Sequence, residues 1–253
     1  GFWGGGTSWT FATALQGRYP VRKQEGMGIM RSITIHGKTI SVFPGKSPEA
    51  PVIYLNTVSG EGPQIFEQLH KTGIPDVSLI TISDLDWNHD LVPWDTPPVF
   101  KNAAPCTGGA DEYLRLLTDV IVPSAESELP GTPCWRGLAG YSLAGLFAVY
   151  TLYGTDAFSR IASISGSLWL PGIKEYVVSH KTRRLPDRLY FSLGDKESKT
   201  RNPLLKTVGE NTQAIYSYYR SQGIHTVFEL NPGNHYNQAA RRTAKGIAWL
   251  LKQ

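Results

Sequence analysis

A serine within a run of small residues is the position of this chain with the clearest chemical potential. Ser142 lies in Gly140-Tyr141-Ser142-Leu143-Ala144-Gly145, after a strand-like segment and before the apolar, helix-like run 146–150. A sharp turn between a strand and a helix holds a serine hydroxyl above the sheet, where a base and backbone N–H groups can act on it. The usual pattern has glycine two residues after the serine, whereas Ala144 stands there and Gly145 follows. A serine that only caps the helix is the alternative.

Two carboxylates and a histidine follow the serine in the chain order that such a turn requires. One strand-like run leads into Gly194-Asp195-Lys196-Glu197, and a later one leads into a turn-rich loop that contains His235. Each separation is long enough for a helix and a strand to return the chain to the same edge of a sheet. We therefore predict Ser142 as nucleophile, Glu197 as acid and His235 as base, with Asp195 as the alternative acid. A surface role for Glu197 and a structural role for His235 are the other possibilities.

The elements that must position these residues follow from the spacing of apolar side chains. Strands are expected at 30–35, 40–43, 51–56, 77–82, 135–139, 161–164, 189–193 and 226–230. Helices are expected at 64–71, 111–122, 143–153, 172–179, 203–221 and 238–252. The first two strands should form an antiparallel hairpin at a sheet edge. The alternation that follows predicts an α/β fold, a mostly parallel eight-stranded sheet with helices on both faces.

In such sheets the ligand crevice lies beyond the carboxyl ends of the strands, where the three candidate residues are placed. Attack on a carbonyl also needs N–H donors for the oxygen that becomes charged. We expect one donor to be the N–H of Leu143, directly after the serine. The second should come from the loop after the third strand, within 57–59, and we assign it to Val58.

A long irregular segment, 83–109, is expected to be a functional loop because loops of this length are uncommon in compact domains. Asp84, Asp86, Asn88 and Asp95 match four positions of a calcium-loop template, but His89 replaces the glycine that the template requires. Calcium is therefore a minor alternative, and no metal site is predicted. Trp87 and Trp94 in this segment are expected either to form one wall of a substrate cleft or to cover the edge of the sheet.

Residues 1–29 differ from the rest of the chain because they are glycine-rich and show no periodicity. We interpret them as a leader, derived from cloning or disordered, and place one catalytic domain at 30–253. The domain is long enough for a sizeable core. No stretch approaches the roughly 20 apolar residues of a membrane span.

The charge and cysteine content exclude several classes of partner. The net charge of +4 comes from dispersed basic residues, so neither a nucleic acid nor a membrane is an expected partner. Cys106 and Cys134 allow at most one disulfide, and Cys134 is expected to be a buried thiol at the start of a central strand. The absence of a disulfide framework predicts a cytoplasmic protein. The sequence leaves both a monomer and a homodimer open.

Four segments together resemble the Putative esterase family of α/β-hydrolases. They are Gly140-Tyr141-Ser142-Leu143-Ala144-Gly145, Ser165-Gly166-Ser167-Leu168-Trp169, Gly194-Asp195-Lys196-Glu197 and Pro232-Gly233-Asn234-His235. That family includes enterochelin esterases, the esterase D type and feruloyl esterases. The resemblance spans about residues 30–253, and the segment 165–169 is most similar to the enterochelin esterase branch.

The resemblance implies an α/β-hydrolase fold and cofactor-free cleavage of carboxylic esters by Ser142, Glu197 and His235. Glu197 is preferred to Asp195 because the acid of this family commonly follows the glycine at its strand end by three residues. Trp169 and Tyr236 are added as candidate substrate contacts. The expected substrates are short-chain, aryl, siderophore-like or carbohydrate-linked esters. Acyl transfer to an alcohol and a catalytically silent binding protein are the competing functions.

Overall fold

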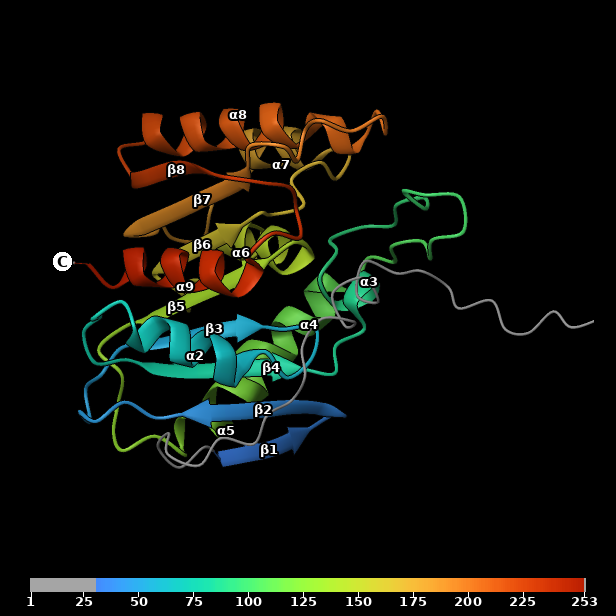
Figure 1. Cartoon of the computed structure of the whole chain (residues 1–253). Coiled ribbons are helices and arrows are strands. Elements are labelled where there is room, and N and C mark those ends of the chain that lie inside the picture. The colour runs from blue at the N-terminus through green and yellow to red at the C-terminus, as the bar shows by residue number, and fades with distance from the viewer. Residues whose placement is uncertain (1–30, 253) are drawn as a thin grey trace, which may run out of the picture.

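The structure is a computed structural model that describes residues 31–252. The predicted leader therefore lies outside the described residues. Eight strands form one sheet in the order β1-β2-β4-β3-β5-β6-β7-β8 (Figure 1). Their bounds are β1 Arg31–Ile35, β2 Lys38–Phe43, β3 Val52–Asn56, β4 Ser78–Ser83, β5 Arg136–Tyr141, β6 Arg160–Ile164, β7 Arg188–Gly194 and β8 His225–Asn231.

The sheet is mostly parallel, as the alternating pattern predicts. β1 pairs antiparallel with β2, and β2 antiparallel with β4, whereas all the other neighbours are parallel. The hairpin at the sheet edge is therefore confirmed. Every position of the central strand β3 is buried and four of its five residues are apolar, as expected of a parallel strand covered by helices on both faces; Asn56 at its carboxyl end is the exception.

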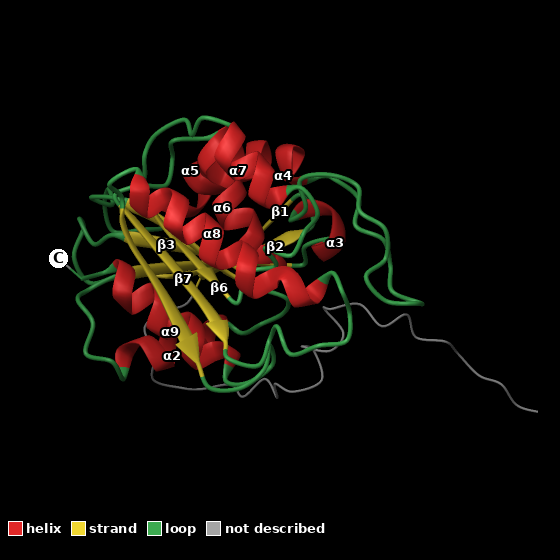
Figure 2. Ribbon diagram, turned by 90° about the horizontal axis from the view of Figure 1, so that it is seen from above, coloured by secondary structure: helices red, strands yellow, loops and turns green. Residues whose placement is uncertain are grey.

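Helices cover both faces of the sheet (Figure 2). α2 (Gly62–His70) and α9 (Ala239–Leu250) lie side by side on one face. The other face carries α4 (Ala110–Leu116), α5 (Val122–Glu126), α6 (Leu143–Gly154), α7 (Ile173–Ser179) and α8 (Val208–Ser221). A short helix, α3 (Trp87–Asp90), lies in the long loop, where the sequence predicts no helix.

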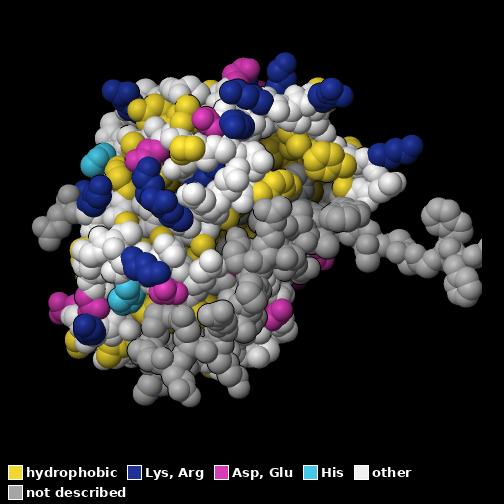
Figure 3. Space-filling model, in the orientation of Figure 1, with side chains coloured by type: hydrophobic (Ala, Val, Ile, Leu, Met, Phe, Trp, Pro, Cys, Tyr) yellow, Lys and Arg dark blue, Asp and Glu magenta, His cyan; other side chains and the backbone are white. Residues whose placement is uncertain are grey.

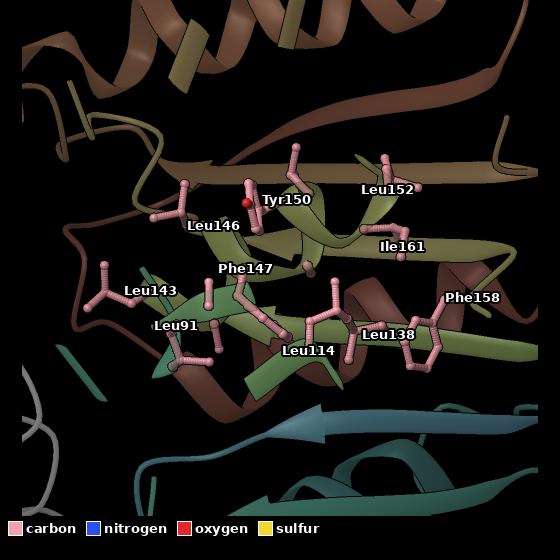
Figure 4. Close-up of a cluster of buried hydrophobic side chains, with 14 of the residues drawn as sticks. Leu91, Leu114, Leu138, Leu143, Leu146, Phe147, Tyr150, Leu152, Phe158 and Ile161 are labelled. Atoms are coloured by element: carbon pink, nitrogen blue, oxygen red, sulfur yellow. The ribbon is translucent and has the colours of Figure 1, made fainter. Parts of the chain in front are cut away.

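The sheet separates two hydrophobic cores, of which the larger surrounds α6 (Figure 4). Eleven of the twelve residues of α6 are buried, so this helix is apolar all round rather than amphipathic. Leu146 and Phe147 pack among Leu138 of β5, Ile161 of β6 and Leu114 of α4. This packing anchors the helix that begins directly after Ser142.

Two helices differ from the prediction in the region of a proline. The helix expected to end at Val122 continues to Glu126 through a π-helical segment, η1 (Leu117–Ile121). Pro123 cannot donate to the carbonyl four residues earlier, and the N–H of Val122 bonds Leu117 O instead, which widens the turn. After Pro203 the chain forms a 3-10 turn, η2 (Leu205–Thr207), before α8 begins.

Cys134 is a further difference, since its thiol is exposed and not buried as predicted. β5 begins only at Arg136, so Cys134 precedes the covered part of the sheet. Cys106 is buried, which raises the pKa of its thiol. Both cysteines are free.

None of the helices within 31–252 has the length and apolar character needed to cross a bilayer. Lysine and arginine side chains are spread over the face shown in Figure 3, with carboxylates among them. This agrees with the dispersed basic residues of the sequence.

Candidate active site

The turn at Ser142 connects the end of β5 to the start of α6. Ser142 has φ 60° and ψ −125°, a strained conformation for a residue with a side chain. Gly140 permits the turn because a Cβ there would lie 2.2 Å from the Ala144 carbonyl. Gly145 approaches Gly166 so closely that a Cβ would lie 2.9 Å from the Gly166 Cα. The turn at Ser142 thus requires glycine at positions 140 and 145, whereas alanine fits at position 144.

The three candidate residues, remote in sequence, form one hydrogen-bonded chain. His235 Nε2 lies 3.1 Å from Ser142 Oγ, and His235 Nδ1 lies 2.8 Å from Glu197 Oε2. Each residue lies at or beyond the carboxyl end of a parallel strand: β5, β7 and β8. The imidazole therefore joins the hydroxyl to the carboxylate in the order that nucleophilic catalysis requires.

Glu197 is held by several donors in a nearly buried position, with 4% of its side chain exposed. Its Oε1 accepts hydrogen bonds from the Gly194 N–H at 2.6 Å and the Ser165 hydroxyl at 2.7 Å. Burial by itself raises the pKa of Glu197, but the hydrogen bond and charge of His235, with the Gly194 and Ser165 donors, hold that pKa below its usual value. The carboxylate is thus ionised and available to orient His235.

Asp195, the alternative acid, has a different partner. Its Oδ1 accepts the Gly233 N–H at 2.8 Å and therefore braces the loop that carries His235. The side chain that contacts the imidazole is Glu197. The structure thus places the acid three residues after Gly194.

Three further side chains contact Glu197 or the backbone of His235, and the sequence assigned no site role to them: Ser165, Tyr141 and Arg242. Ser165 has φ 45°, which the sequence pattern could not reveal. Burial raises the pKa of Tyr141 to about 12, so its hydroxyl stays protonated and donates to His235 O at 2.5 Å. Arg242 reaches the same region from α9. Only the tertiary fold brings these elements to the site.

The two predicted oxyanion donors differ in their surroundings. Leu143 is the first residue of α6, where backbone N–H groups have no partner inside the helix and the helix dipole favours negative charge. Val58 lies two residues beyond Asn56, which pairs with Gly140, so it is level with Ser142. Its N–H, however, points to Glu61 Oε1 at 3.3 Å. An oxyanion would have to compete with that carboxylate, and the role of Val58 stays a prediction.

A cavity of about 270 Å³ opens beside Glu197 and His235. Trp169 and Tyr236, both predicted substrate contacts, line it, and so does Phe100 from the long loop. Lys196 and Lys199 add positive charge to the same cavity. It is therefore an aromatic pocket with cationic groups, next to the imidazole.

The two tryptophans of the long loop lie elsewhere. Trp87 is buried and lines a separate, smaller cavity with Val58 and Tyr141. Trp94 donates its indole N–H to Pro171 O at 2.9 Å and packs on Tyr176 of α7. Trp94 thus covers the α7 side of the molecule and does not line the cavity beside His235.

Two acidic residues of the long loop make structural contacts. Asp90 pairs with Lys38 of β2 and ties the loop to the sheet, and Asp95 accepts the Gly108 N–H within the loop. Within 31–252 no group of three or more His, Cys, Asp or Glu side chains could hold a metal ion.

A mostly parallel eight-stranded sheet with a serine at a strand-turn-helix junction defines the α/β-hydrolase class. A family model described as "Putative esterase" matches residues 50–238, which is most of the chain. The chain belongs to the Putative esterase family and is a carboxylesterase. The resemblance predicted from the four motifs is confirmed.

Individual relatives are distant in sequence. The uncharacterized protein YbbA of Bacillus subtilis (strain 168) is 22% identical over 185 residues, which cover 70% of this chain and 74% of that protein. The siderophore hydrolase EstA from Aspergillus nidulans superimposes with a TM-score of 0.70 at 19% identity, covering 92% of this chain and 97% of that one. An IroE-like serine hydrolase from Shewanella oneidensis has a TM-score of 0.71 at 20% identity, covering 88% and 80%. These two likenesses show a shared fold.

Proposed function

We propose that this carboxylesterase works as a serine hydrolase through an acyl-enzyme formed on Ser142. The observation that carries the proposal is the continuous chain Ser142 Oγ, His235 Nε2, His235 Nδ1 and Glu197 Oε2, with distances of 3.1 and 2.8 Å at its two links. In this arrangement the hydroxyl donates to the imidazole, which donates through its other nitrogen to the carboxylate.

The geometry supports the following sequence of steps. His235 Nε2 takes the proton of Ser142 as Oγ attacks the ester carbonyl, and the resulting oxyanion accepts the N–H of Leu143. His235 then returns the proton to the alcohol oxygen, which leaves as the carbon–oxygen bond breaks. Water, deprotonated by His235, attacks the acyl-enzyme and releases the carboxylic acid and Ser142. Glu197 holds the imidazole and stabilises its charged form throughout.

Covalent labelling and product analysis test this proposal. A fluorophosphonate probe should modify the protein at Ser142, as located by peptide mass spectrometry, and p-nitrophenyl acetate should be hydrolysed. A protein that stays unlabelled would be a silent binding protein. Adding methanol or a sugar should yield acetic acid as the main product, because the cavity reaches the surface at the exposed side chains of Phe100 and Tyr236 and admits water. An acetylated alcohol as the main product would indicate an acyltransferase.

The substrates we propose are esters with a short or aromatic acyl group, including siderophore-like esters. Three aromatic side chains, Phe100, Trp169 and Tyr236, line the cavity beside His235, and a planar ring can pack against such side chains. The name of EstA, a siderophore hydrolase, agrees with this class. Hydrolysis rates for p-nitrophenyl acetate to butyrate, methyl ferulate, acetylated xylan and enterobactin would rank the candidates.

Replacing Tyr236 by alanine should weaken the binding of aromatic esters selectively. Tyr236 is 37% exposed, so its loss should leave the core intact. An aromatic contact is worth about 0.5–1.5 kcal/mol beyond its buried area, so KM for methyl ferulate should rise about two- to tenfold. The KM for methyl butyrate should change much less. Equal increases for both esters would argue against an aromatic subsite at this position.

A further inference from the structure

The fold buries an arginine directly behind the candidate active site. Arg242 lies in the first turn of α9, on the sheet face opposite α6, and is 3% exposed. We propose that Arg242 is a positioning residue: it fixes the loop that carries His235 and the carboxylate of Glu197 in one relative geometry. The inference rests on the proposed function, since it assigns a role within that same site.

The first set of contacts joins Arg242 to the loop before His235. Its Nη2 donates to Pro232 O at 2.8 Å, and its Nη1 donates to Asn234 O at 3.0 Å. Tyr141 adds the bond to His235 O, and Arg242 Nη1 lies 3.4 Å from the Tyr141 hydroxyl. Arg242 thus binds the carbonyl groups on both sides of Gly233, and Tyr141 binds the carbonyl group of His235. The backbone of the imidazole-bearing turn therefore has little freedom to move away from Ser142.

The second set of contacts joins Arg242 to the acid. Nη1 lies 3.4 Å from both Glu197 Oε1 and the Ser165 hydroxyl. With the Gly194 N–H and the Ser165 hydroxyl, Arg242 surrounds Oε1 with donors, so Oε2 is the oxygen that faces His235. Gly194 allows this close packing, because a Cβ there would lie 2.3 Å from the Gly233 carbonyl oxygen and 3.1 Å from both guanidinium Nη atoms. These contacts to Oε1 fix the Glu197 carboxylate on the side that faces away from the His235 imidazole.

The requirement is for arginine and not only for a positive charge. A guanidinium is planar and carries five N–H donors in a fixed fork, so one side chain can bond two loop carbonyls while it contacts a carboxylate. A lysine ammonium is a point charge on a flexible stem and cannot span these acceptors in the same geometry. Lysine at this position should keep the charge beside Glu197 and lose the link to the loop.

The test compares Arg242→Lys with Arg241→Lys in the full-length protein. Arg241 is the adjacent, exposed residue and is outside the site, so its variant controls for a changed α9. We expect Arg242→Lys to lower kcat for p-nitrophenyl acetate by about a hundredfold, since a 1 Å misplacement can cost that much, with KM changed less than about twofold. Arg241→Lys should match the wild type. Rates are expressed per active site, titrated with a fluorophosphonate, so that unfolded protein does not count.

A second variant covers the case in which lysine prevents folding. Arg242→Ala should recover part of kcat when millimolar guanidinium chloride is added, whereas methylammonium chloride should have no such effect. A per-site kcat of Arg242→Lys equal to that of the wild type, or Arg242→Ala without guanidinium rescue, would overturn the positioning role. If the wild type itself is not labelled at Ser142, the proposed function fails instead, so the two failures are distinguishable.

Discussion

Replacing Ser142 by alanine is expected to lower kcat for ester hydrolysis by at least about 10⁴-fold, because the acyl-enzyme can no longer form on Ser142. The folded structure should persist. Ser142 makes no side-chain cap hydrogen bond to α6, so the variant should not lose the ~1 kcal/mol that removal of a helix cap costs. Initial rates with p-nitrophenyl acetate and the thermal unfolding midpoint measure the two effects.

Ser167→Ala is the matched control for this experiment. Its hydroxyl lies 3.4 Å from Ser142 Oγ and is equally buried, but it is not a member of the chain formed by Ser142, His235 and Glu197. The control should retain most of the activity and remain reactive toward a fluorophosphonate. If Ser142→Ala turned over esters normally, the nucleophile would lie elsewhere. If Ser142→Ala instead lost stability and kept its activity, Ser142 would have a structural role only.

Replacing Glu197 by glutamine should reduce kcat by about 10³ to 10⁴-fold, because an amide cannot stabilise the charged imidazole and favours the wrong tautomer of His235. Asp195→Asn is the matched control. Asparagine keeps an oxygen that can accept the Gly233 N–H, so this variant should lose less than about tenfold, the equivalent of 1.4 kcal/mol. The reverse ranking of the two variants would make Asp195 the acid. Equal, small effects would indicate a serine–histidine pair that needs no carboxylate.

The effect of Glu197→Gln on thermal stability should depend on pH. The pKa of Glu197 is held below its usual value, so the folded state favours the ionised carboxylate. The stability that this provides is present above the ordinary glutamate pKa of about 4.3 and is lost as the pH falls through the lower folded value. The difference in Tm between the wild type and Glu197→Gln should therefore shrink on acidification from pH 7 to about 3.

The sequence by itself determined the order of the strands along the chain and indicated the candidate catalytic residues. Alternating apolar residues predicted the two edge strands, and continuous apolar runs such as 52–55 predicted strands that are buried on both faces of a parallel sheet. Small residues at 140, 144 and 145 indicated the turn at Ser142, since a close strand–helix approach leaves no room for larger side chains. The strand-to-loop settings of Glu197 and His235 indicated the remaining two groups. These are local signals, carried by neighbours in the chain.

Only the tertiary structure decided which partners these groups have. Glu197 rather than Asp195 contacts His235. The N–H of Val58 donates to the carboxylate of Glu61. Trp94 packs against Tyr176 of α7 and does not line the cavity beside His235. Arg242 had no sequence signal at all, because arginine in an amphipathic helix is typical of an exposed face, as Arg241 is. Its role arises where α9, β7 and the loop after β8 meet, with contacts that span up to 101 residues along the chain. Hydrogen bonds are short and directional, so side chains two residues apart in sequence can have unrelated partners.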